Sequence, residues 1–271
     1  MISHSEKINQ EREQPAGTIR SVEKVIDILE LLARESRGLA LGDLAKRLDL
    51  NASTAHHLLA TLKGRGLVAQ DERTKMYRIG YRLVGMVNRF LSGTDLYPAG
   101  ISPVEELRDL SGETSYLTAF QRREAAVILA LTGARPIQAR RFHRPGHSNF
   151  HSTATGKLML AHLPTEEVTA LLSGRELAQF TPNTMTDPTQ LQADLRAIRE
   201  RGYALDREED YIGVECVAFP VYDAGGDCVA AVSVSYPAAP RERTEELVRL
   251  VSAAAEKISA NLGAVPARSI A

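Results

Sequence analysis

The most regular alternation of apolar and polar positions in the chain lies between residues 39 and 62. Apolar side chains recur there at intervals of three and four residues, the spacing that keeps them on one face of an α-helix. They form two sets, Leu41, Leu44, Ala45 and Leu48 and then Ala55, Leu58, Leu59 and Leu62. The pattern predicts two short amphipathic helices that share a small core and are separated by a break at residues 49–51.

The break supplies the start of the second helix. Asn51 or Ser53 can cap it by accepting a hydrogen bond from a free backbone amide, so we expect the helix to begin near Ala52. Its outward face carries side chains that can bond to base edges or phosphates, namely Ser53, Thr54, His56, His57, Thr61 and Lys63. The pair is typical of a helix-turn-helix, although a solvated face in an all-α domain would show the same pattern.

The flanking segments favour a DNA-binding module. Residues 67–79 contain two short β-prone runs around a charged turn, which predicts a hairpin wing whose Arg73, Lys75 and Arg78 could follow phosphates. Residues 19–32 have apolar positions at helical spacing and predict a supporting helix. We therefore expect a winged helix-turn-helix domain over residues 18–80.

Length and charge suggest two domains of different kinds. A chain of 271 residues exceeds the usual single domain, and its 44% hydrophobic content is enough for packed cores. Residues 18–80 carry 11 basic and 8 acidic side chains, whereas residues 81–271 carry 20 and 23. A module with a net charge of +3 beside a remainder at −3 fits a DNA-binding domain attached to something else.

The chain ends, the apolar runs and the cysteines argue against a membrane protein and against a secreted, disulfide-rich one. Residues 1–17 are polar and predict a disordered arm, and residues 264–271 predict a tail. No apolar run reaches the roughly 18 residues of a membrane span, and the start lacks a signal-peptide core. Two cysteines do not make a disulfide framework. We expect a cytoplasmic protein with no membrane partner.

A connecting helix is predicted over residues 81–96. Its apolar stripe consists of Leu83, Met86, Val87, Phe90 and Leu91. Such a stripe would suit packing against a second copy of the chain, and equally against the chain's own second domain.

Helical and strand-like patterns alternate unevenly over residues 97–263. The predicted helices are 103–110, 153–162, 165–172, 191–201 and 244–262, and the predicted strands are 116–120, 125–131, 214–222 and 228–236. The Asp-Ala-Gly-Gly-Asp sequence at residues 223–227 predicts that the last two strands form a hairpin. Neighbouring strands with segregated helices favour an α+β domain with an antiparallel sheet.

The register of this hairpin decides which side chains share a face. A two-residue loop at residues 225–226 would set Cys216 opposite Ser235, whereas a four-residue loop would set it opposite Ser233. In either register the three side chains share a face, and small polar groups among apolar ones suit a pocket for a small polar ligand. The alternative is that both serines face solvent.

Several motifs suggest enzyme or metal chemistry without completing it. The Thr-Gly-Lys sequence at residues 155–157 lacks the glycine and the hydroxyl that a Walker loop requires. His143, His147 and His151 have a metal-ligand spacing, but a Pro-Gly pair interrupts the helix that would align them, so we expect no metal site. The acidic run at residues 206–210 has no evident nucleophile beside it and is typical of a solvated turn.

Three separated segments resemble one protein family. They are Gly202-Tyr-Ala-Leu-Asp-Arg-Glu-Glu209 followed after six residues by Cys216-Val-Ala-Phe-Pro-Val-Tyr-Asp223, then Ser152-Thr-Ala-Thr-Gly-Lys157 with Leu160-Ala161, and finally residues 53–62. From about residue 18 to residue 263 the chain resembles the isocitrate lyase regulator (IclR) family of bacterial transcription factors.

The resemblance implies a winged helix-turn-helix followed by a GAF-like effector domain, assembled as homodimers or homotetramers on operator DNA. It implies a small organic acid or related metabolite as effector, with no cofactor. The effector-binding residues that it implies are Thr155, Asp206, Cys216, Ser233 and Ser235. Arg140, Arg141 and Arg144 could attract a carboxylate, although arginine is most often a surface residue.

The candidate DNA-binding residues combine the polar helix face with nearby cations. They are Arg20, Asn51, Ser53, Thr54, His56, His57, Lys63, Arg65 and Arg78. The recognition helix would enter the major groove and the cations would contact phosphates. His57 departs from the family, which commonly has arginine there, and a neutral imidazole lacks the bidentate fork that suits guanine.

We therefore predict a ligand-responsive transcriptional regulator, a repressor of catabolic genes rather than an activator, and not an enzyme. One alternative is a GAF-domain or metal-dependent enzyme that uses the helix-turn-helix as a scaffold. The other is an architectural DNA-binding protein indifferent to metabolites.

Overall fold

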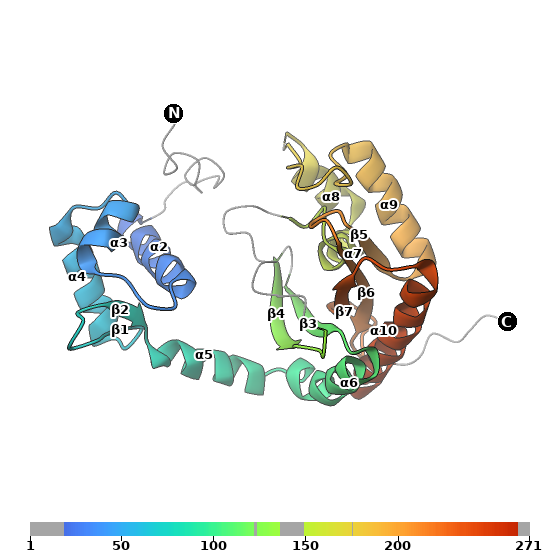
Figure 1. The fold of residues 1–271 in the computed structure, drawn as a ribbon, viewed down its shortest axis with the longest axis horizontal. Coiled ribbons are helices and arrows are strands. Elements are labelled where there is room, and N and C mark those ends of the chain that lie inside the picture. Colours follow the sequence, from blue (N-terminus) through green and yellow to red (C-terminus); the bar gives the residue numbers. More distant parts are fainter. Residues whose placement is uncertain (1–18, 122–123, 136–148, 175, 265–271) are drawn as a thin grey trace. The chain divides into compact units, whose positions relative to one another are not determined.

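The computed structural model describes residues 19–121, 124–135, 149–174 and 176–264 (Figure 1). The chain divides into two compact units, Met1–Gly93 and Thr94–Ala271. The predicted arm and tail, at residues 1–17 and 264–271, lie outside the described residues except for Ala264. Within the described ranges, no helix combines the length and the apolar composition needed to cross a bilayer.

The first unit contains the predicted helix-turn-helix and wing. Its elements are α2 (Arg20–Arg34), α3 (Leu41–Arg47), α4 (Ala52–Gly64), β1 (Val68–Gln70), β2 (Tyr77–Ile79) and α5 (Tyr81–Ser92). The strands pair antiparallel, with Ala69 opposite Arg78. This arrangement confirms the winged helix-turn-helix predicted from the apolar spacing.

The apolar positions that predicted these helices meet in one core. Ile28, Leu44 and Leu59, one from each of the first three helices, are fully buried in it. Tyr77 ties the wing to this core, because it exchanges backbone hydrogen bonds with Leu39 just before α3. The wing is therefore held against the helices at its base and leaves its charged turn exposed.

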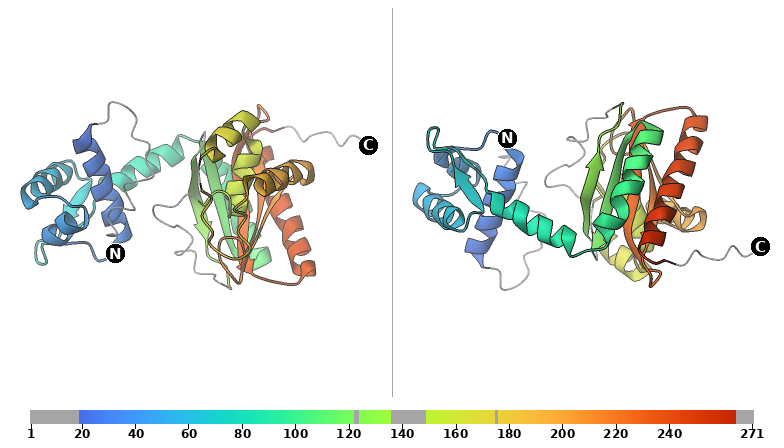
Figure 2. Two further views of the ribbon diagram at one scale, coloured as in Figure 1. Left: turned by 90° about the horizontal axis from the view of Figure 1, so that it is seen from above. Right: turned by 90° about the horizontal axis from the view of Figure 1, so that it is seen from below.

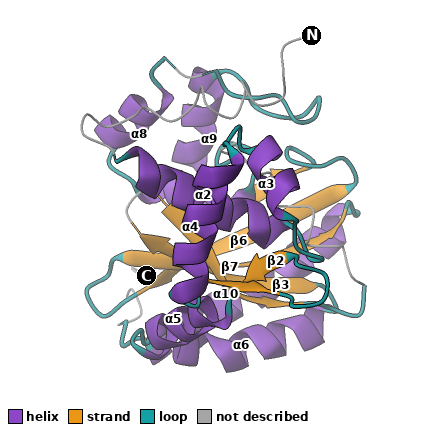
Figure 3. Ribbon diagram, turned by 90° about the vertical axis from the view of Figure 1, so that its left-hand side faces the viewer, coloured by secondary structure: helices purple, strands orange, loops and turns teal. Residues whose placement is uncertain are grey.

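The second unit is an antiparallel sheet between helices (Figure 3). Its strands are β3 (Thr114–Gln121), β4 (Glu124–Leu131), β5 (Ala204–Arg207), β6 (Val214–Tyr222) and β7 (Cys228–Pro237), in the order β4-β3-β7-β6-β5. Its helices are α6 (Leu96–Ser111), α7 (Ala154–His162), α8 (Thr165–Leu172), α9 (Pro188–Arg201) and α10 (Arg241–Asn261). The predicted α+β class with an antiparallel sheet is confirmed.

Several elements differ from the sequence prediction. The connecting helix predicted over residues 81–96 ends at Ser92, and Leu96 begins the next helix. Helix α6 begins seven residues before the predicted start at Pro103, because this proline is accommodated inside the helix. Strand β5 was not predicted, since its four residues lie next to the acidic run and give too short a pattern. It forms an edge of the sheet by pairing with β6.

The hairpin of β6 and β7 adopts one of the two predicted registers. Cys216 lies opposite Ser235 and Ala218 opposite Ser233, as a two-residue loop would require. The turn itself is longer, since Asp223 donates its backbone amide to the carbonyl of Asp227, and a bulge after Val221 restores the register.

Helices cover both faces of the sheet. Figure 2 shows α6 and α10 side by side against one face of the sheet. The side chains of β7 that point toward these two helices are buried in their core, namely Val232, Val234 and Tyr236. The opposite face packs under α7, α8 and α9, with Ala218 and Ala231 in their core. Because side chains alternate along a strand, β7 contributes to both cores.

Helix α6 lies unusually close to the sheet at Gly100. A Cβ atom at this position would be 2.3 Å from Cδ2 of Leu117 on β3, a separation that side chains do not tolerate. Leu117 is fully buried and belongs to the core beneath α6 and α10. The missing side chain of Gly100 therefore sets the spacing between α6 and β3.

A buried ion-pair cluster joins α7, α9 and the segment after β5. The Lys157 side chain is 1% exposed, and its Nζ lies 2.7 Å from both carboxylate oxygens of Glu209 and 2.9 Å from Oδ2 of Asp194. Arg201 approaches the other Asp194 oxygen at 3.4 Å. Two carboxylates with two cations balance their charges, which is the condition under which buried charges are tolerated.

Replacing Lys157 with methionine is expected to destabilise the protein by about 3–5 kcal/mol, because the buried carboxylate of Glu209 loses its cation and Asp194 keeps only the longer contact with Arg201. Urea denaturation of the full-length chain measures the loss. Lys257→Met is the matched control, since Lys257 pairs with Glu106 at 2.7 Å on the surface and such pairs contribute about 0–1 kcal/mol. Equal losses in the two variants would contradict a structural role for the buried cluster.

Candidate functional site

The outward face of α4 presents the predicted polar side chains to solvent. Ser53, His56 and His57 are exposed, while Ala55 and Leu59 on the opposite face are buried. The rings of the two histidines meet edge to face with their centroids 5.8 Å apart. Thr54 is half-buried. The exposed row begins in the first turn of the helix, the part of a recognition helix that contacts base edges.

Asn51 has a structural task at the start of α4. Its Oδ1 accepts a hydrogen bond of 2.7 Å from the backbone amide of Thr54, which makes it the N-cap. The sequence left the cap open between Asn51 and Ser53, and the structure assigns it to Asn51. Ser53 is thereby left with an exposed hydroxyl.

The predicted phosphate-binding cations are all exposed, and some also join elements of the first unit. Lys63 at the end of α4 donates to Oε1 of Gln70 on the wing, at 3.0 Å. Arg78 on β2 donates from Nε to the carbonyl of Arg37, at 3.3 Å. Arg65 follows α4 directly, and Arg20 is the first residue of α2. Exposed contacts of this kind are weak enough for the cations to exchange them for phosphates.

In the second unit, the predicted effector residues converge on the face beneath α7. Asp206, Cys216 and Ser235 lie directly opposite one another on β5, β6 and β7 and form a polar row across the sheet. The Sγ of Cys216 lies 3.0 Å from the Oγ of Ser235. Ser233, two residues along β7, receives a hydrogen bond of 3.5 Å from the Thr155 hydroxyl of α7.

The two serines are buried, with 5% and 6% of their surfaces exposed, so the solvated alternative for Ser233 and Ser235 is wrong. The polar row also continues onto β3, which the sequence analysis did not single out. Thr114 lies opposite Ser235, and Tyr116 lies opposite Ser233. The polar side chains at positions 114, 116 and 118 alternate along the chain, and this alternation is the signal that could have found them.

Burial changes the protonation of the site. Removal from water raises the pKa of Asp206 to about 8, and the neighbouring carboxylate of Glu209 adds to the rise, although the Glu209 backbone amide donates to Asp206 Oδ1 at 2.7 Å. Burial also raises the pKa of the Cys216 thiol well above its ordinary value. At neutral pH the site is therefore lined by hydroxyls, a thiol and a largely protonated carboxyl.

The acidic run at residues 206–210 is not the solvated turn that the sequence suggested. Asp206, Glu209 and Asp210 are all buried. Glu209 pairs with Lys157, and Asp210 Oδ1 accepts a hydrogen bond of 2.8 Å from the Ser152 hydroxyl. The pattern of charge indicated exposure because it carries no information about partners more than 50 residues away in the sequence.

Some of the remaining sequence candidates lie outside the described residues. These are Arg140, Arg141 and Arg144, with His143 and His147. His151 is described and is buried beside Phe180, with its Nε2 at 2.9 Å from the carbonyl oxygen of Ala178. Burial lowers the pKa of His151 and so favours the neutral ring.

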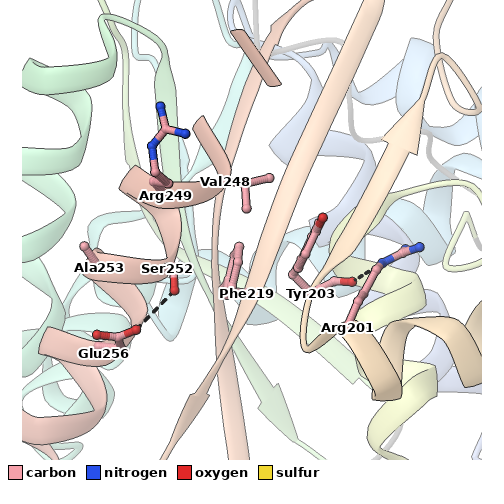
Figure 4. Close-up of a pocket in the computed structure, with 8 residues that line it drawn as sticks. All are labelled: Arg201, Tyr203, Phe219, Val248, Arg249, Ser252, Ala253 and Glu256. Carbon is pink, nitrogen blue, oxygen red and sulfur yellow. Dashed lines mark hydrogen bonds between the residues drawn. The ribbon is translucent and has the colours of Figure 1, made fainter. Parts of the chain in front are cut away.

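A surface hollow of about 360 Å³ lies on the other face of the sheet, beside α10 (Figure 4). The stacked rings of Tyr203 and Phe219, with centroids 5.0 Å apart, are among the side chains that line it. Ser252 donates to Glu256 on its α10 side. The predicted effector residues do not line this hollow, because they belong to the opposite face of the sheet, the face under α7.

A winged helix-turn-helix unit followed by an α+β unit with a buried row of polar side chains defines the class of DNA-binding transcriptional regulators with a sensory domain. The model of the IclR helix-turn-helix domain matches residues 21–72, and that of the bacterial transcriptional regulator IclR C-terminal domain matches residues 88–260. The chain belongs to the IclR family of bacterial transcriptional regulators.

Curated relatives are similar over most of their length. The regulator BhcR of Paracoccus denitrificans is 35% identical over 226 residues, covering 83% of this chain and 80% of that protein. KdgR of Escherichia coli is 33% identical over 258 residues, covering 94% and 97%. The acetate operon repressor of Salmonella typhimurium is 30% identical over 251 residues, covering 91% of each. These relatives are regulators, so the enzyme alternative is wrong.

Solved structures show the same fold. IclR of Thermotoga maritima superposes with a TM-score of 0.71 at 30% identity and covers 91% of this chain and 100% of its own. An IclR homologue of Microbacterium hydrocarbonoxydans, crystallised with 4-hydroxybenzoate, superposes with a TM-score of 0.76 at 22% identity and covers 89% and 98%.

Asn51→Ala is expected to lower the stability of the first unit by about 1 kcal/mol, because it removes the N-cap of α4. Thermal denaturation measures the loss. Ser53→Ala is the matched control, since an exposed hydroxyl outside the cap contributes within about 0.5 kcal/mol. A larger loss from Ser53→Ala than from Asn51→Ala would mean that the cap is assigned to the wrong residue.

Asp206→Asn is expected to flatten the dependence of stability on pH. In the natural protein the raised pKa of Asp206 favours folding fully below its ordinary value of 3.8 and progressively less up to about 8, where the buried carboxyl ionises. Asparagine keeps the acceptor for the Glu209 amide but does not ionise. Urea denaturation across this range should show a steeper fall for the natural protein than for the variant, and parallel curves would contradict the raised pKa.

Proposed function

We propose that this protein is a repressor of catabolic genes that binds operator DNA through α4 and leaves it when a small organic acid occupies the polar site of the effector unit. The observation that carries the proposal is the buried polar row of Asp206, Cys216 and Ser235 beneath α7. A buried set of hydrogen-bonding groups on an otherwise apolar face suits a small polar ligand.

The exposed face of α4 supports operator binding. Ser53, His56 and His57 occupy the first turns of the helix and would contact base edges, whereas Lys63, Arg65 and Arg78 would contact phosphates. Asn51 would position the helix as its cap and contact DNA only through its amide nitrogen. Arg20 belongs to the same proposal as a phosphate contact.

The chemistry of the effector site supports a small acid rather than a cation. Hydroxyl groups of Thr155, Ser233 and Ser235 can donate to carboxylate oxygens, and a protonated Asp206 would do the same without repelling the anion. Ionisation of Asp206 above about pH 8 would place a second negative charge beside the ligand. Effector affinity is therefore expected to fall in alkaline solution.

Repression is supported by the names of relatives, which include the acetate operon repressor and the repressor AllR. We propose that the protein acts in the cytoplasm as a homodimer or homotetramer. The apolar side chains of Met86, Val87 and Phe90 on α5 are about half exposed. They support packing against a second copy, whereas the side chain of Leu91 lies outside the described set.

The effector would act by its different affinity for two arrangements of the DNA-binding units, of which only one matches the spacing of operator half-sites. An architectural protein would bind DNA with the same affinity whether or not a metabolite is present. A change of operator affinity on addition of the effector therefore distinguishes a ligand-responsive repressor from an architectural DNA-binding protein.

His57→Ala is expected to weaken binding to the operator by about tenfold or more while leaving binding to random duplex unchanged, because a base contact is lost. Lys63→Met should weaken both and lower the salt dependence by about one counterion. Fluorescence anisotropy with duplexes from the region upstream of the protein's own gene measures these effects, with Lys257→Met as the charge-matched control. Unchanged discrimination in His57→Ala would remove α4 as the base-reading helix.

A further inference from the structure

Two hydroxyl groups on β3 face the effector site without a partner in the described part of the chain. The Oγ1 of Thr114 and the phenolic oxygen of Tyr116 are both buried from solvent and make no hydrogen bond there. Thr114 as a whole is 1% exposed. Buried hydroxyls almost always have a partner, so two unpaired ones on adjacent rows need an explanation.

The sheet register places both groups in the site. Thr114 lies directly opposite Ser235, so the polar row runs across four strands from Asp206 through Cys216 and Ser235 to Thr114. Tyr116 lies opposite Ser233 in the next row. Burial raises the pKa of Tyr116 and the Ser235 hydroxyl lowers it in part, but the two side chains do not meet the distance and angle requirements of a hydrogen bond.

The other polar groups of the site already have partners. Cys216 and Ser235 contact each other at 3.0 Å, and Thr155 donates to Ser233 at 3.5 Å. Thr114 and Tyr116, at the far side of the row from Asp206, are therefore the hydroxyls of the site that have no hydrogen-bond partner at all among the described residues. Each hydroxyl there carries one proton to donate and lacks an acceptor.

We infer that Thr114 and Tyr116 bind the effector and select a molecule that has a second hydrogen-bond acceptor besides its carboxylate. This inference rests on the proposed function, because it assigns further residues to the same site. A carbonyl or hydroxyl oxygen on the ligand would accept from β3, while the carboxylate would accept from the hydroxyls of α7 and β7. A simple acid without that oxygen would leave the β3 hydroxyls unpaired, so the protein should discriminate against it.

The experiment uses the full-length protein and pairs of acids with one carbon skeleton, 2-oxobutyrate with butyrate and 4-hydroxybenzoate with benzoate. Isothermal titration measures the affinity of each acid for the natural protein and for Thr114→Val, Tyr116→Phe and Ser235→Ala. We expect at least one oxygen-bearing acid to bind more tightly than its partner. In Thr114→Val or Tyr116→Phe its affinity should fall about tenfold while that of the simple acid changes little, so that the discrimination disappears.

A second measurement separates ligand binding from a structural role. Removing an unpaired buried hydroxyl should leave the melting temperature of the free protein unchanged or higher, whereas removing a structural hydrogen bond should lower it. We expect Thr114→Val and Tyr116→Phe to melt no lower than the natural protein. A lower melting temperature together with undiminished discrimination would overturn the inference.

The outcomes also distinguish this inference from the proposed function. If Ser235→Ala loses acid binding but both β3 variants keep the natural discrimination, the effector site stands and the inference is wrong. If none of these acids binds the natural protein, the effector class proposed above is wrong, and the assignment of the β3 residues to an acid falls with it.

Discussion

The effector unit depends on a cation that has been taken out of water. Lys157 comes from the helix that also carries Thr155, and its carboxylate partners come from α9 and from the segment between β5 and β6. An unpaired charge at this depth would cost about 3–5 kcal/mol, so the three segments stabilise one another when they are buried together. Their joint burial in turn places Asp206 in a dry environment and holds α7 over the polar row. The chemistry of the site is a consequence of this mutual neutralisation.

Local patterns in the sequence were sufficient for much of the fold. The apolar spacing at Leu44, Leu59 and Leu62 predicted the helix-turn-helix, since a short helix must bury one face whatever follows it. The turn signal at residues 223–227 predicted the β6–β7 hairpin for a similarly local reason. It could not select the register, because the observed turn has a length between the two alternatives considered, and the bulge after Val221 restores the register of the shorter one. The polar face shared by Cys216, Ser233 and Ser235 was predictable because both registers preserve it.

Features that depend on distant partners could not be predicted. The acidic run looked solvated because its neutralising lysine lies about 50 residues earlier in the chain. Strand β5 is four residues long and is defined by its pairing with β6 more than by its own composition. The contribution of Thr114 and Tyr116 became visible only when β3 was placed beside β7. Asn51 and Ser53 were equivalent as caps in the sequence, and only the backbone geometry at the start of α4 distinguishes them.

The close approach of Gly100 to Leu117 has a consequence for the freedom of β3 and α6 to move within the second unit. Tyr116 and its neighbour Leu117 point to opposite surfaces of β3, the first toward the polar site and the second into the backbone of α6. The single strand β3 therefore separates the proposed effector site on one face of the sheet from helix α6 on the other. Because Gly100 has no side chain, Leu117 packs directly against α6, and β3 and α6 cannot approach each other further at this crossing.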